Sequence, residues 1–163
     1  MNFPVKEIAQ KLSVANATLA VAESCTGGLL AGVLTDLPGA SDFFRGGVIT
    51  YATETKTDIL GVPSELITRF GVVSAECAEA MARAVAEKFR TDFALSTTGI
   101  AGPGGGTQKT PVGTVFIGIF TPRGTSYVKL NTKGTTRDAV RLEAVTFALN
   151  TLAGLISENF STQ

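Results

Sequence analysis

The hydrophobic positions of the chain fall into two kinds of stretch that follow one another from end to end. Longer stretches, with apolar residues spaced three or four apart, predict helices that bury one face. We expect these helices at residues 4–14, 26–36 and 75–89, the last with Ser74 as its N-cap, and from about Arg137 onward. Shorter apolar runs predict buried strands at residues 18–23, 47–51 and 93–98.

Two further patterns complete the expected elements. Apolar residues at 112–120 and 126–130 flank a Pro-Arg-Gly turn and predict an antiparallel hairpin, and short helices are expected at 54–60 and after Pro63. Strands that alternate with helices, together with one hairpin, predict an α/β protein with three layers, α/β/α, and a mixed, mostly parallel sheet. No repeat and no linker divides the sequence, so residues 1–163 are expected to form a single domain.

The composition argues against several classes of protein. Hydrophobic residues make up 44% of the chain and charged residues 17%, which is typical of a folded domain rather than a disordered one. The formal net charge is zero and no basic run occurs, so no nucleic-acid partner is expected. We find neither a secretory signal pattern nor an apolar run that predicts a membrane span, and we therefore expect a cytoplasmic protein. Cys25 and Cys77 lack metal-ligand spacing, so we expect free thiols and no metal site.

The run Ala-Glu-Ser-Cys-Thr-Gly-Gly at residues 22–28 connects the first expected strand to the helix after it. Ser24 therefore lies where a strand ends, and Thr26, Gly27 and Gly28 lie where a helix begins. Glycines allow a ligand close to the backbone, and a helix N-terminus offers unpaired N–H groups to an anion. The run fits either a nucleophile with an anion cradle or an ordinary helix cap with glycines for packing.

The chain contains no histidine, so a nucleophilic serine needs a different base. Lys56 is the candidate, and Tyr51, just before it, could relay a proton or orient the amine. An unperturbed lysine has a pKa of about 10.4, so keeping it neutral at pH 7 costs roughly 4.6 kcal/mol, which burial or a nearby cation must offset. The same residues also fit an ordinary helix start with Lys56 in water.

A glycine-rich loop, Gly99–Gly106, follows the third expected strand and its hydroxyl residues 96–98. It has neither the Gly-Lys-Ser/Thr ending of a Walker A loop nor the glycine spacing of a dinucleotide fingerprint. Its backbone N–H groups suit a phosphate or a developing oxyanion, although a flexible surface loop is the alternative. Because loops at the carboxyl ends of strands converge in α/β sheets, this loop, Ser24 and Lys56 are expected to share one crevice.

Two further features bear on the chemistry of this crevice. Arg137 and Arg141 are one helical turn apart, a spacing that fits a bidentate grip on a phosphate as well as a solvated helix face. Cys25 is a rival nucleophile, because thiolates are strong nucleophiles and a helix N-terminus lowers the pKa of a thiol. Cys77 lies within an expected helix and is assigned to packing.

The chain resembles the CinA C-terminal domain family in five runs spread over nearly its whole length. These are Ala-Glu-Ser-Cys-Thr-Gly-Gly at 22–28, Val-Ile-Thr-Tyr-Ala at 48–52 with Lys56, Gly-Val-Val-Ser at 71–74, Thr-Gly-Ile-Ala-Gly-Pro at 98–103 and Pro-Val-Gly-Thr-Val at 111–115. Characterised members of this family are nicotinamide-nucleotide amidohydrolases, and many carry a larger N-terminal domain in front. The chain is similar to the stand-alone deamidases.

The resemblance implies hydrolysis of the carboxamide of nicotinamide mononucleotide to nicotinic acid mononucleotide and ammonia, with no metal or organic cofactor. It implies Ser24 as the nucleophile, Lys56 as its base and Tyr51 as the family's tyrosine. Ser41 and Thr98 match positions that handle substrate. A covalent route suits this chemistry, because an amide is a poor electrophile with a poor leaving group.

The resemblance implies an arginine in this last segment, where relatives often have Gly-Asp-Arg. Residues Gly134–Arg137 read Gly-Thr-Thr-Arg instead, so the family's arginine corresponds to either Arg137 or Arg141. Backbone N–H groups near Thr26–Gly28, or in the loop Gly99–Gly102, are expected to hold the oxyanion. Two alternatives remain at this point, namely a non-catalytic module that binds a pyridine nucleotide and an amidohydrolase with Cys25 as nucleophile. The partner is a small nucleotide in each case, and the apolar C-terminal helix permits a homodimer.

Overall fold

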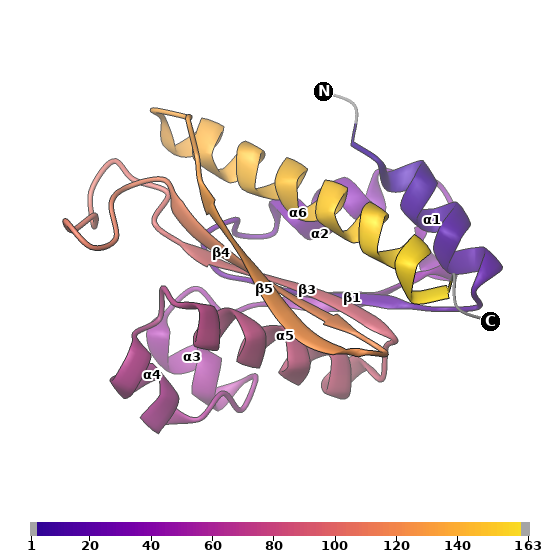
Figure 1. The fold of residues 1–163 in the computed structure, drawn as a ribbon, viewed down its shortest axis with the longest axis horizontal. Helices are drawn as coiled ribbons and strands as arrows, with labels where there is room; N and C mark the ends of the chain where they lie inside the picture. Colours follow the sequence, from indigo (N-terminus) through magenta and orange to yellow (C-terminus); the bar gives the residue numbers. More distant parts are fainter. Residues whose placement is uncertain (1–2, 161–163) are drawn as a thin grey trace.

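The computed structural model describes residues 3–160, with side chains up to residue 158, and its centre is a five-stranded sheet in the order β2-β1-β3-β4-β5 (Figure 1). The strands are β1 (Leu19–Glu23), β2 (Phe44–Ile49), β3 (Phe93–Gly99), β4 (Thr114–Thr121) and β5 (Gly124–Asn131). β1 pairs in parallel with β2 and β3, whereas β4 is antiparallel to both β3 and β5. Four strands therefore point the same way, which confirms the mixed, mostly parallel sheet and its hairpin.

Helices cover both faces of the sheet, which confirms the expected three layers (Figure 1). One face is covered by α5, which contacts β1, β3, β4 and β5, while α3 and α4 lie beside it. The other face is covered by α1, α2 and α6. Their bounds are α1 (Val5–Val14), α2 (Leu29–Thr35), α3 (Thr53–Asp58), α4 (Ser64–Phe70), α5 (Ala75–Phe89) and α6 (Arg137–Phe160), and a short 3₁₀ helix, η1 (Ala40–Asp42), precedes β2.

Side-chain size along the central strands explains how close each helical layer lies. In β1, the larger Leu19 and Val21 belong to the core under α1, α2 and α6, whereas the alternate positions toward α5 are alanines. A Cβ at Gly118 of β4 would lie 2.1 Å from the carbonyl oxygen of Ala78, so α5 rests on the sheet where only glycine fits. Small residues on one face therefore bring α5 close to the sheet.

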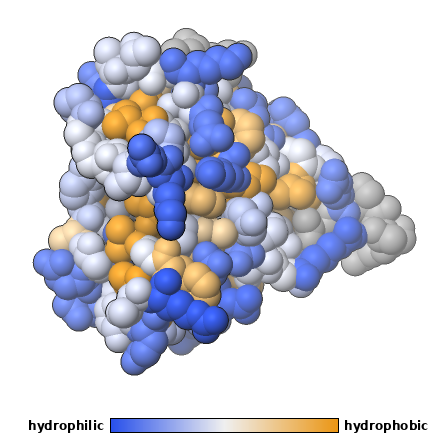
Figure 2. All heavy atoms as spheres, turned by 60° about the vertical axis from the view of Figure 1, so that its left-hand side comes forward, coloured by the Kyte–Doolittle hydropathy of each residue, from blue (hydrophilic) through white to orange (hydrophobic). Residues whose placement is uncertain are grey.

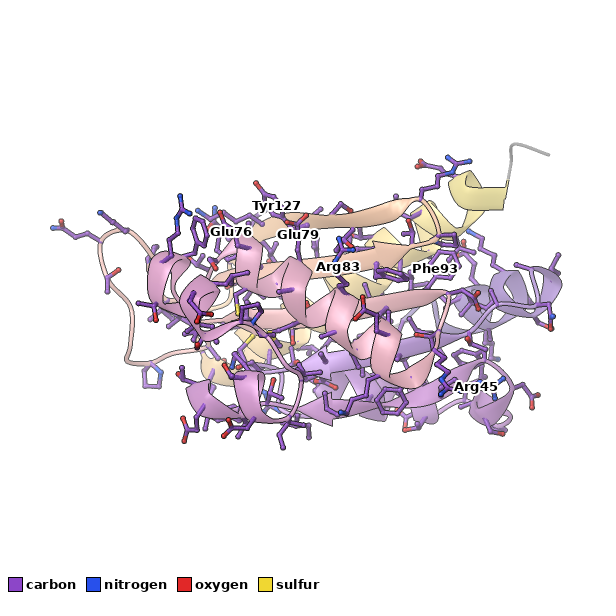
Figure 3. All side chains as sticks on the ribbon, turned by 90° about the horizontal axis from the view of Figure 1, so that it is seen from below. Arg45, Glu76, Glu79, Arg83, Phe93 and Tyr127 are labelled. Atoms are coloured by element: carbon purple, nitrogen blue, oxygen red, sulfur yellow. The ribbon has the colours of Figure 1, made fainter. Side chains whose placement is uncertain are left out.

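The helix α5 is amphipathic, as its sequence pattern predicts. Its buried face includes Met81 and Val85, while Glu76, Glu79 and Arg83 lie on its other side (Figure 3). The Oγ of Ser74 accepts a hydrogen bond of 3.1 Å from the backbone N–H of Cys77, which confirms Ser74 as the N-cap.

The long helix α6 differs from the expectation that no apolar run of the chain is long enough to span a membrane. Residues Arg137–Glu158 are long and apolar enough, with a mean hydropathy of 1.4, to cross a membrane by length and composition alone. In this structure the apolar face lies on the sheet, and its buried residues are Val140, Ala144, Val145, Ala148, Leu149, Leu152, Ala153 and Ile156. These buried residues make α6 part of the core of the domain.

The first helix after β1 begins later than its sequence pattern indicates. Residues 24–28 form a turn, and α2 starts only at Leu29 rather than at residue 26. Gly27 and Gly28 have φ angles of +58° and +94°, a left-handed conformation that other residues adopt only with strain. These two glycines bend the chain sharply between β1 and α2, and we refer to residues 24–28 as the nucleophile turn.

Candidate active site

The three parallel strands end side by side, and the segments that follow them form one cavity. The last residue of β1, Glu23, pairs with Ile49 of β2 and with Thr97 of β3. A cavity of about 270 Å³ lies beyond these ends, lined by residues from the nucleophile turn, from α3 and from the loop after β3. Figure 2 turns this end of the molecule toward the viewer and shows hydrophobic side chains recessed between hydrophilic ones. The expected convergence of the strand ends is confirmed.

Ser24 and Lys56 meet at this cavity although 32 positions separate them in the chain. The Nζ of Lys56 donates to the Oγ of Ser24 at 3.1 Å and to the backbone carbonyl of Thr50 at 2.7 Å. Lys56 is only 1% exposed and belongs to the last turn of α3, which rules out the alternative that it lies in water. The carbonyl of Thr50 therefore orients the amine toward the serine hydroxyl.

The environment of Lys56 favours its neutral form. Burial lowers the pKa of Lys56 below its ordinary value of about 10.5, and this effect outweighs the opposing influence of Cys77, Cys25 and Glu54. Among residues 3–158, no carboxylate lies within ion-pair distance of its amine. A neutral amine has a lone pair, so Lys56 can accept the proton of Ser24.

Glu23 organises the nucleophile turn from the buried side, a role that sequence reasoning missed. Its carboxylate accepts hydrogen bonds from the backbone N–H groups of Gly28, Leu30 and Ala31 at 3.0, 3.1 and 2.8 Å, and from the Oγ1 of Thr26 at 2.6 Å. The side chain is 1% exposed. An acidic residue at the end of an otherwise apolar strand was the signal, because a buried carboxylate needs several donors.

We expect the Glu23→Gln variant to unfold more readily than the parent protein. The amide keeps one acceptor oxygen where the carboxylate uses both, so buried N–H donors lose partners and the free energy of unfolding falls by about 2 kcal/mol. Urea denaturation followed by circular dichroism measures this change. The matched control is Glu87→Gln, at an exposed position of α5. Equal stability of the two variants would contradict the role given to Glu23.

The N–H groups of the nucleophile turn are not all available to an anion. Glu23 already occupies those of Gly28 and Leu30, and the N–H of Gly27 donates to the carbonyl of Ser24 at 3.1 Å. Within residues 3–160, the backbone N–H group of Thr26 has no acceptor, and that of Cys25 bonds to the thiol of its own residue rather than to a backbone carbonyl. Of the expected oxyanion donors at residues 26–28, only the N–H of Thr26 is therefore left free, and the N–H of Cys25, which was not among them, lies beside it.

The glycine-rich loop after β3 forms the opposite wall of the cavity. Thr98, Gly99 and Gly102 all line it, and the Oγ1 of Thr98 donates to the carbonyl of Val72 at 2.5 Å. Ala101 and Gly102 are buried, while the residues from Pro103 to Lys109 are exposed. The loop is therefore anchored at its base, where it borders Ser24, and reaches solvent at its tip.

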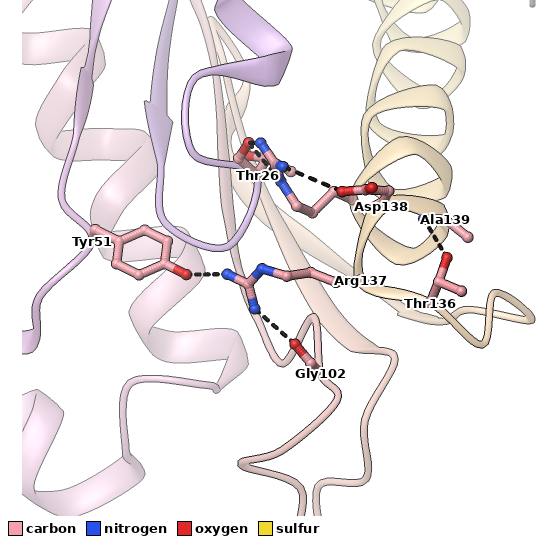
Figure 4. Close-up of polar contacts among 8 residues, drawn as sticks. Thr26, Tyr51, Gly102, Thr136, Arg137, Asp138 and Ala139 are labelled. Carbon is pink, nitrogen blue, oxygen red and sulfur yellow. Dashed lines mark hydrogen bonds and ion pairs between the residues drawn. The ribbon is translucent and has the colours of Figure 1, made fainter.

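Tyr51 and Arg137 lie together at the entrance of the cavity (Figure 4). One nitrogen of Arg137 donates to the hydroxyl of Tyr51 and another to the carbonyl of Gly102, the latter at 2.8 Å. Tyr51 is 56% exposed and has no hydrogen bond to Lys56 in the described structure. The expectation that Tyr51 orients the amine is thus not met, and the carbonyl of Thr50 takes that role.

Several other residues singled out from the sequence lie outside the cavity. The side chain of Thr26 is buried and bonds to Glu23 and Thr97, and neither Gly27 nor Gly28 lines the cavity. Arg141 also lies outside it and bonds instead to the carbonyl of Thr26. These residues shape the nucleophile turn rather than the cavity surface.

Ser41 lies even farther from the cavity. It belongs to η1, which precedes the amino end of β2, whereas the cavity lies at the carboxyl ends of the strands. Six residues of extended strand separate these positions by about 20 Å. The role of Ser41 in substrate handling stays a prediction, and within one chain this residue does not reach the site.

The thiol beside Ser24 is poorly suited to nucleophilic attack. Cys25 is buried, and burial raises the pKa of its thiol to about 11, so the thiol remains protonated near neutral pH. The expected lowering by a helix N-terminus is absent because α2 starts only at Leu29. Burial likewise raises the pKa of Cys77 to about 11. Among the described side chains, no group of three His, Cys, Asp or Glu residues could hold a metal ion.

Comparison with known proteins assigns the chain to a family. Residues 2–156 match the sequence model of the CinA C-terminal domain. The chain belongs to the CinA C-terminal domain family. It is 56% identical over 117 residues to a CinA-like protein of Desulfotalea psychrophila, which covers 72% of this chain and 28% of that protein. A CinA-like protein of Endomicrobium trichonymphae is 44% identical over 152 residues, which covers 93% and 35%. The chain thus spans about a third of the length of such curated relatives.

Solved structures of the CinA superfamily share the fold over nearly the whole chain. The competence/damage inducible protein CihA of Agrobacterium tumefaciens is 37% identical, with a TM-score of 0.87 over 95% of this chain and 98% of that one. A CinA superfamily protein of Klebsiella pneumoniae is 30% identical, with a TM-score of 0.90 over 94% and 96%. In these two crystal structures, the part that matches this domain makes up nearly the whole chain.

Proposed function

We propose that this CinA domain hydrolyses the carboxamide of nicotinamide mononucleotide to nicotinic acid mononucleotide and ammonia. The observation that carries the proposal is the buried Lys56 amine, 3.1 Å from the Oγ of Ser24, with a pKa lowered by burial. The family resemblance supplies the substrate, and the cavity supports a small one. Its volume of about 270 Å³ lies just below the ~300–1,000 Å³ usual for small-molecule sites.

The first half of the reaction forms an acyl-enzyme. Lys56 accepts the hydroxyl proton of Ser24 while the Oγ attacks the carboxamide carbon, and the carbonyl oxygen becomes an oxyanion. The N–H groups of Cys25 and Thr26 donate to no backbone carbonyl of the described residues and follow the nucleophile directly, which supports a role as oxyanion donors. The carbon–nitrogen bond then breaks, and the Lys56 ammonium gives its proton to the departing amine, which leaves as ammonia.

The second half releases the acid. A water molecule attacks the acyl carbon while the neutral Lys56 accepts one of its protons, and the bond between the carbon and the Oγ of Ser24 breaks. The proton then returns from Lys56 to Ser24, so the enzyme is regenerated. The same lysine acts as base and acid in turn, which requires an amine that is neutral in the resting state.

The other end of the substrate is assigned to the entrance of the cavity. Arg137 is the only arginine or unburied lysine in the cavity lining of the described structure, so it is the candidate for binding the phosphate. Its nitrogens now bond to neutral acceptors, the Tyr51 hydroxyl and the Gly102 carbonyl. A phosphate would offer a charged acceptor at the same place, while the carboxamide lies against Ser24.

The proposal is tested by incubating the purified protein with nicotinamide mononucleotide and measuring ammonia and nicotinic acid mononucleotide in equal amounts. We expect turnover that persists when a chelator is present, because the proposed steps use only protein side chains. Turnover that a chelator abolishes would overturn the metal-free mechanism. A folded protein that binds the nucleotide without turnover would identify a binding module instead of an enzyme.

A further inference from the structure

Two arginines one helical turn apart at the start of α6 reach different parts of the site. Arg137 bonds to Tyr51 and Gly102 at the cavity entrance (Figure 4). Arg141 donates from Nε and Nη2 to the carbonyl oxygen of Thr26, at 3.2 and 2.7 Å, and does not line the cavity. The shared i, i+4 spacing therefore does not mean a shared ligand.

The contact made by Arg141 falls on the nucleophile turn itself. The N–H of Thr26 has no acceptor among the described residues, and the carbonyl of Thr26 also accepts from the N–H of Leu29 at 3.1 Å. A Cβ on Gly27 would lie 3.6 Å from the Nη2 of Arg141, so the guanidinium lies against the turn at its exposed residue Gly27. Glu23 bonds to the same turn from the buried side.

We propose that Arg141 is a positioning residue, which holds the nucleophile turn against α6 so that Ser24 and the N–H of Thr26 keep their orientation toward the cavity. The inference rests on the proposed function, in which Ser24 is the nucleophile. Two donors of one planar guanidinium on one carbonyl limit both translation and rotation of the turn. Lysine has one point of contact and cannot reproduce this geometry.

The other roles open to Arg141 are weaker. Its ion pair with Asp138, at 3.8 Å, involves a carboxylate side chain that is 95% exposed, so solvent screens it. A direct grip on the substrate phosphate would need the guanidinium in the cavity lining, where Arg137 lies instead. What the structure supports is a contact with the backbone of the turn.

The test compares steady-state kinetics of the Arg141→Ala and Arg141→Lys variants on nicotinamide mononucleotide. We expect kcat to fall by up to about a hundredfold with little change in KM, because a small displacement of a nucleophile has that effect on rate. Added guanidinium ion should restore part of the turnover of Arg141→Ala and none in Arg141→Lys, whose side chain still fills the space. Asp138→Asn is the matched control and should keep both constants. A raised KM with unchanged kcat, or no change at all, would overturn the proposal.

Two measurements separate this inference from the proposed reaction. A fluorophosphonate probe, detected by mass spectrometry, should label Ser24 more slowly in Arg141→Ala than in the parent, whether or not the nucleotide is the substrate. Hydrogen exchange at the amides of Gly28, Leu30 and Ala31 should be faster in the variant, because these amides depend on the turn for their bonds to Glu23. Equal exchange and equal labelling in variant and parent would refute the positioning role, even if the parent enzyme hydrolyses the nucleotide.

Discussion

Replacing Lys56 with arginine is expected to reduce the turnover of nicotinamide mononucleotide as severely as replacing it with alanine, by about a hundred- to ten-thousand-fold. Arginine stays protonated at any pH that the protein tolerates, so it cannot take the proton of Ser24. A merely electrostatic role for Lys56 would predict the reverse order, since arginine preserves the positive charge. Steady-state ammonia release by the two variants measures the difference.

The same argument sets the pH dependence of the parent enzyme. Burial lowers the pKa of Lys56, and only the neutral amine is a base, so kcat/KM should fall as the pH drops through that lowered pKa and stay level above it. The plateau should begin well below pH 10.5, the ordinary pKa of the side chain. A plateau that begins only near pH 10.5 would show that the amine is not perturbed.

The pH dependence of the free energy of unfolding is an independent measure of the lowered pKa of Lys56. Between the lowered pKa of folded Lys56 and its ordinary pKa near 10.5, the unfolded chain binds the proton that the folded chain lacks. The free energy of unfolding contributed by Lys56 therefore rises with pH across this window, and the penalty for burying the amine is largest below it. Lys56→Met should remove this slope, whereas Lys88→Met, at an exposed position of α5, should keep it.

The comparison of Lys56→Arg with Lys56→Ala requires that both variants fold, because arginine is larger than lysine and the site is buried. Lys56→Met has a similar length without the amine and serves as the second variant. Circular dichroism and the midpoint of urea denaturation establish whether each protein folds. Near-normal turnover in any folded Lys56 variant would refute the general-base role.

Removing the hydroxyl of Ser24 is expected to abolish turnover, whereas removing the thiol of Cys25 is not. Loss of the nucleophile in serine hydrolases lowers kcat by about a million-fold, because the catalytic groups act as a unit. Cys25 has a pKa raised to about 11 and is almost wholly protonated near neutral pH. Ammonia release by Ser24→Ala and Cys25→Ala separates the two candidate nucleophiles directly.

A third variant sharpens the distinction between these neighbours. Ser24→Cys places a thiol at the position of the serine hydroxyl, whose oxygen lies 3.1 Å from the Nζ of Lys56. We expect a thiol reagent to label this new cysteine more quickly than it labels Cys25 in the parent. Activity lost in Cys25→Ala but kept in Ser24→Ala would reverse the assignment. The stability of both alanine variants, measured by urea denaturation, guards against a loss of folding.

The order and type of the elements follow from the sequence alone, because the period of apolar residues is a local property of the chain. The buried runs before Ser24 and Thr98, the hairpin around residue 122 and the helix capped by Ser74 all appear where their patterns place them. The observed bounds of an element differ from the predicted ones where the apolar pattern does not mark the end of that element. The helix after β1 starts late because two glycines in left-handed conformation extend the turn.

The candidate site was predicted in part for a related reason. Residues at the carboxyl ends of parallel strands converge in any such sheet, so the meeting of Ser24, Lys56 and the loop after Thr98 could be expected from their places in the chain. Tyr51 and Ser41 show the limit of this reasoning. Tyr51 turns toward Arg137 rather than the amine, and Ser41 lies at the other end of its strand.

By itself the sequence determined which elements form, in which order, and which side chains capable of this chemistry follow the strands. Only the tertiary structure decided that Lys56 is buried and directed at Ser24. It also decided that Glu23 accepts hydrogen bonds from the N-terminus of α2, and that Arg141 donates to a backbone carbonyl instead of facing the cavity. Hydrogen bonds, burial and the resulting pKa depend on groups packed together from distant parts of the chain, and no local pattern records those distances.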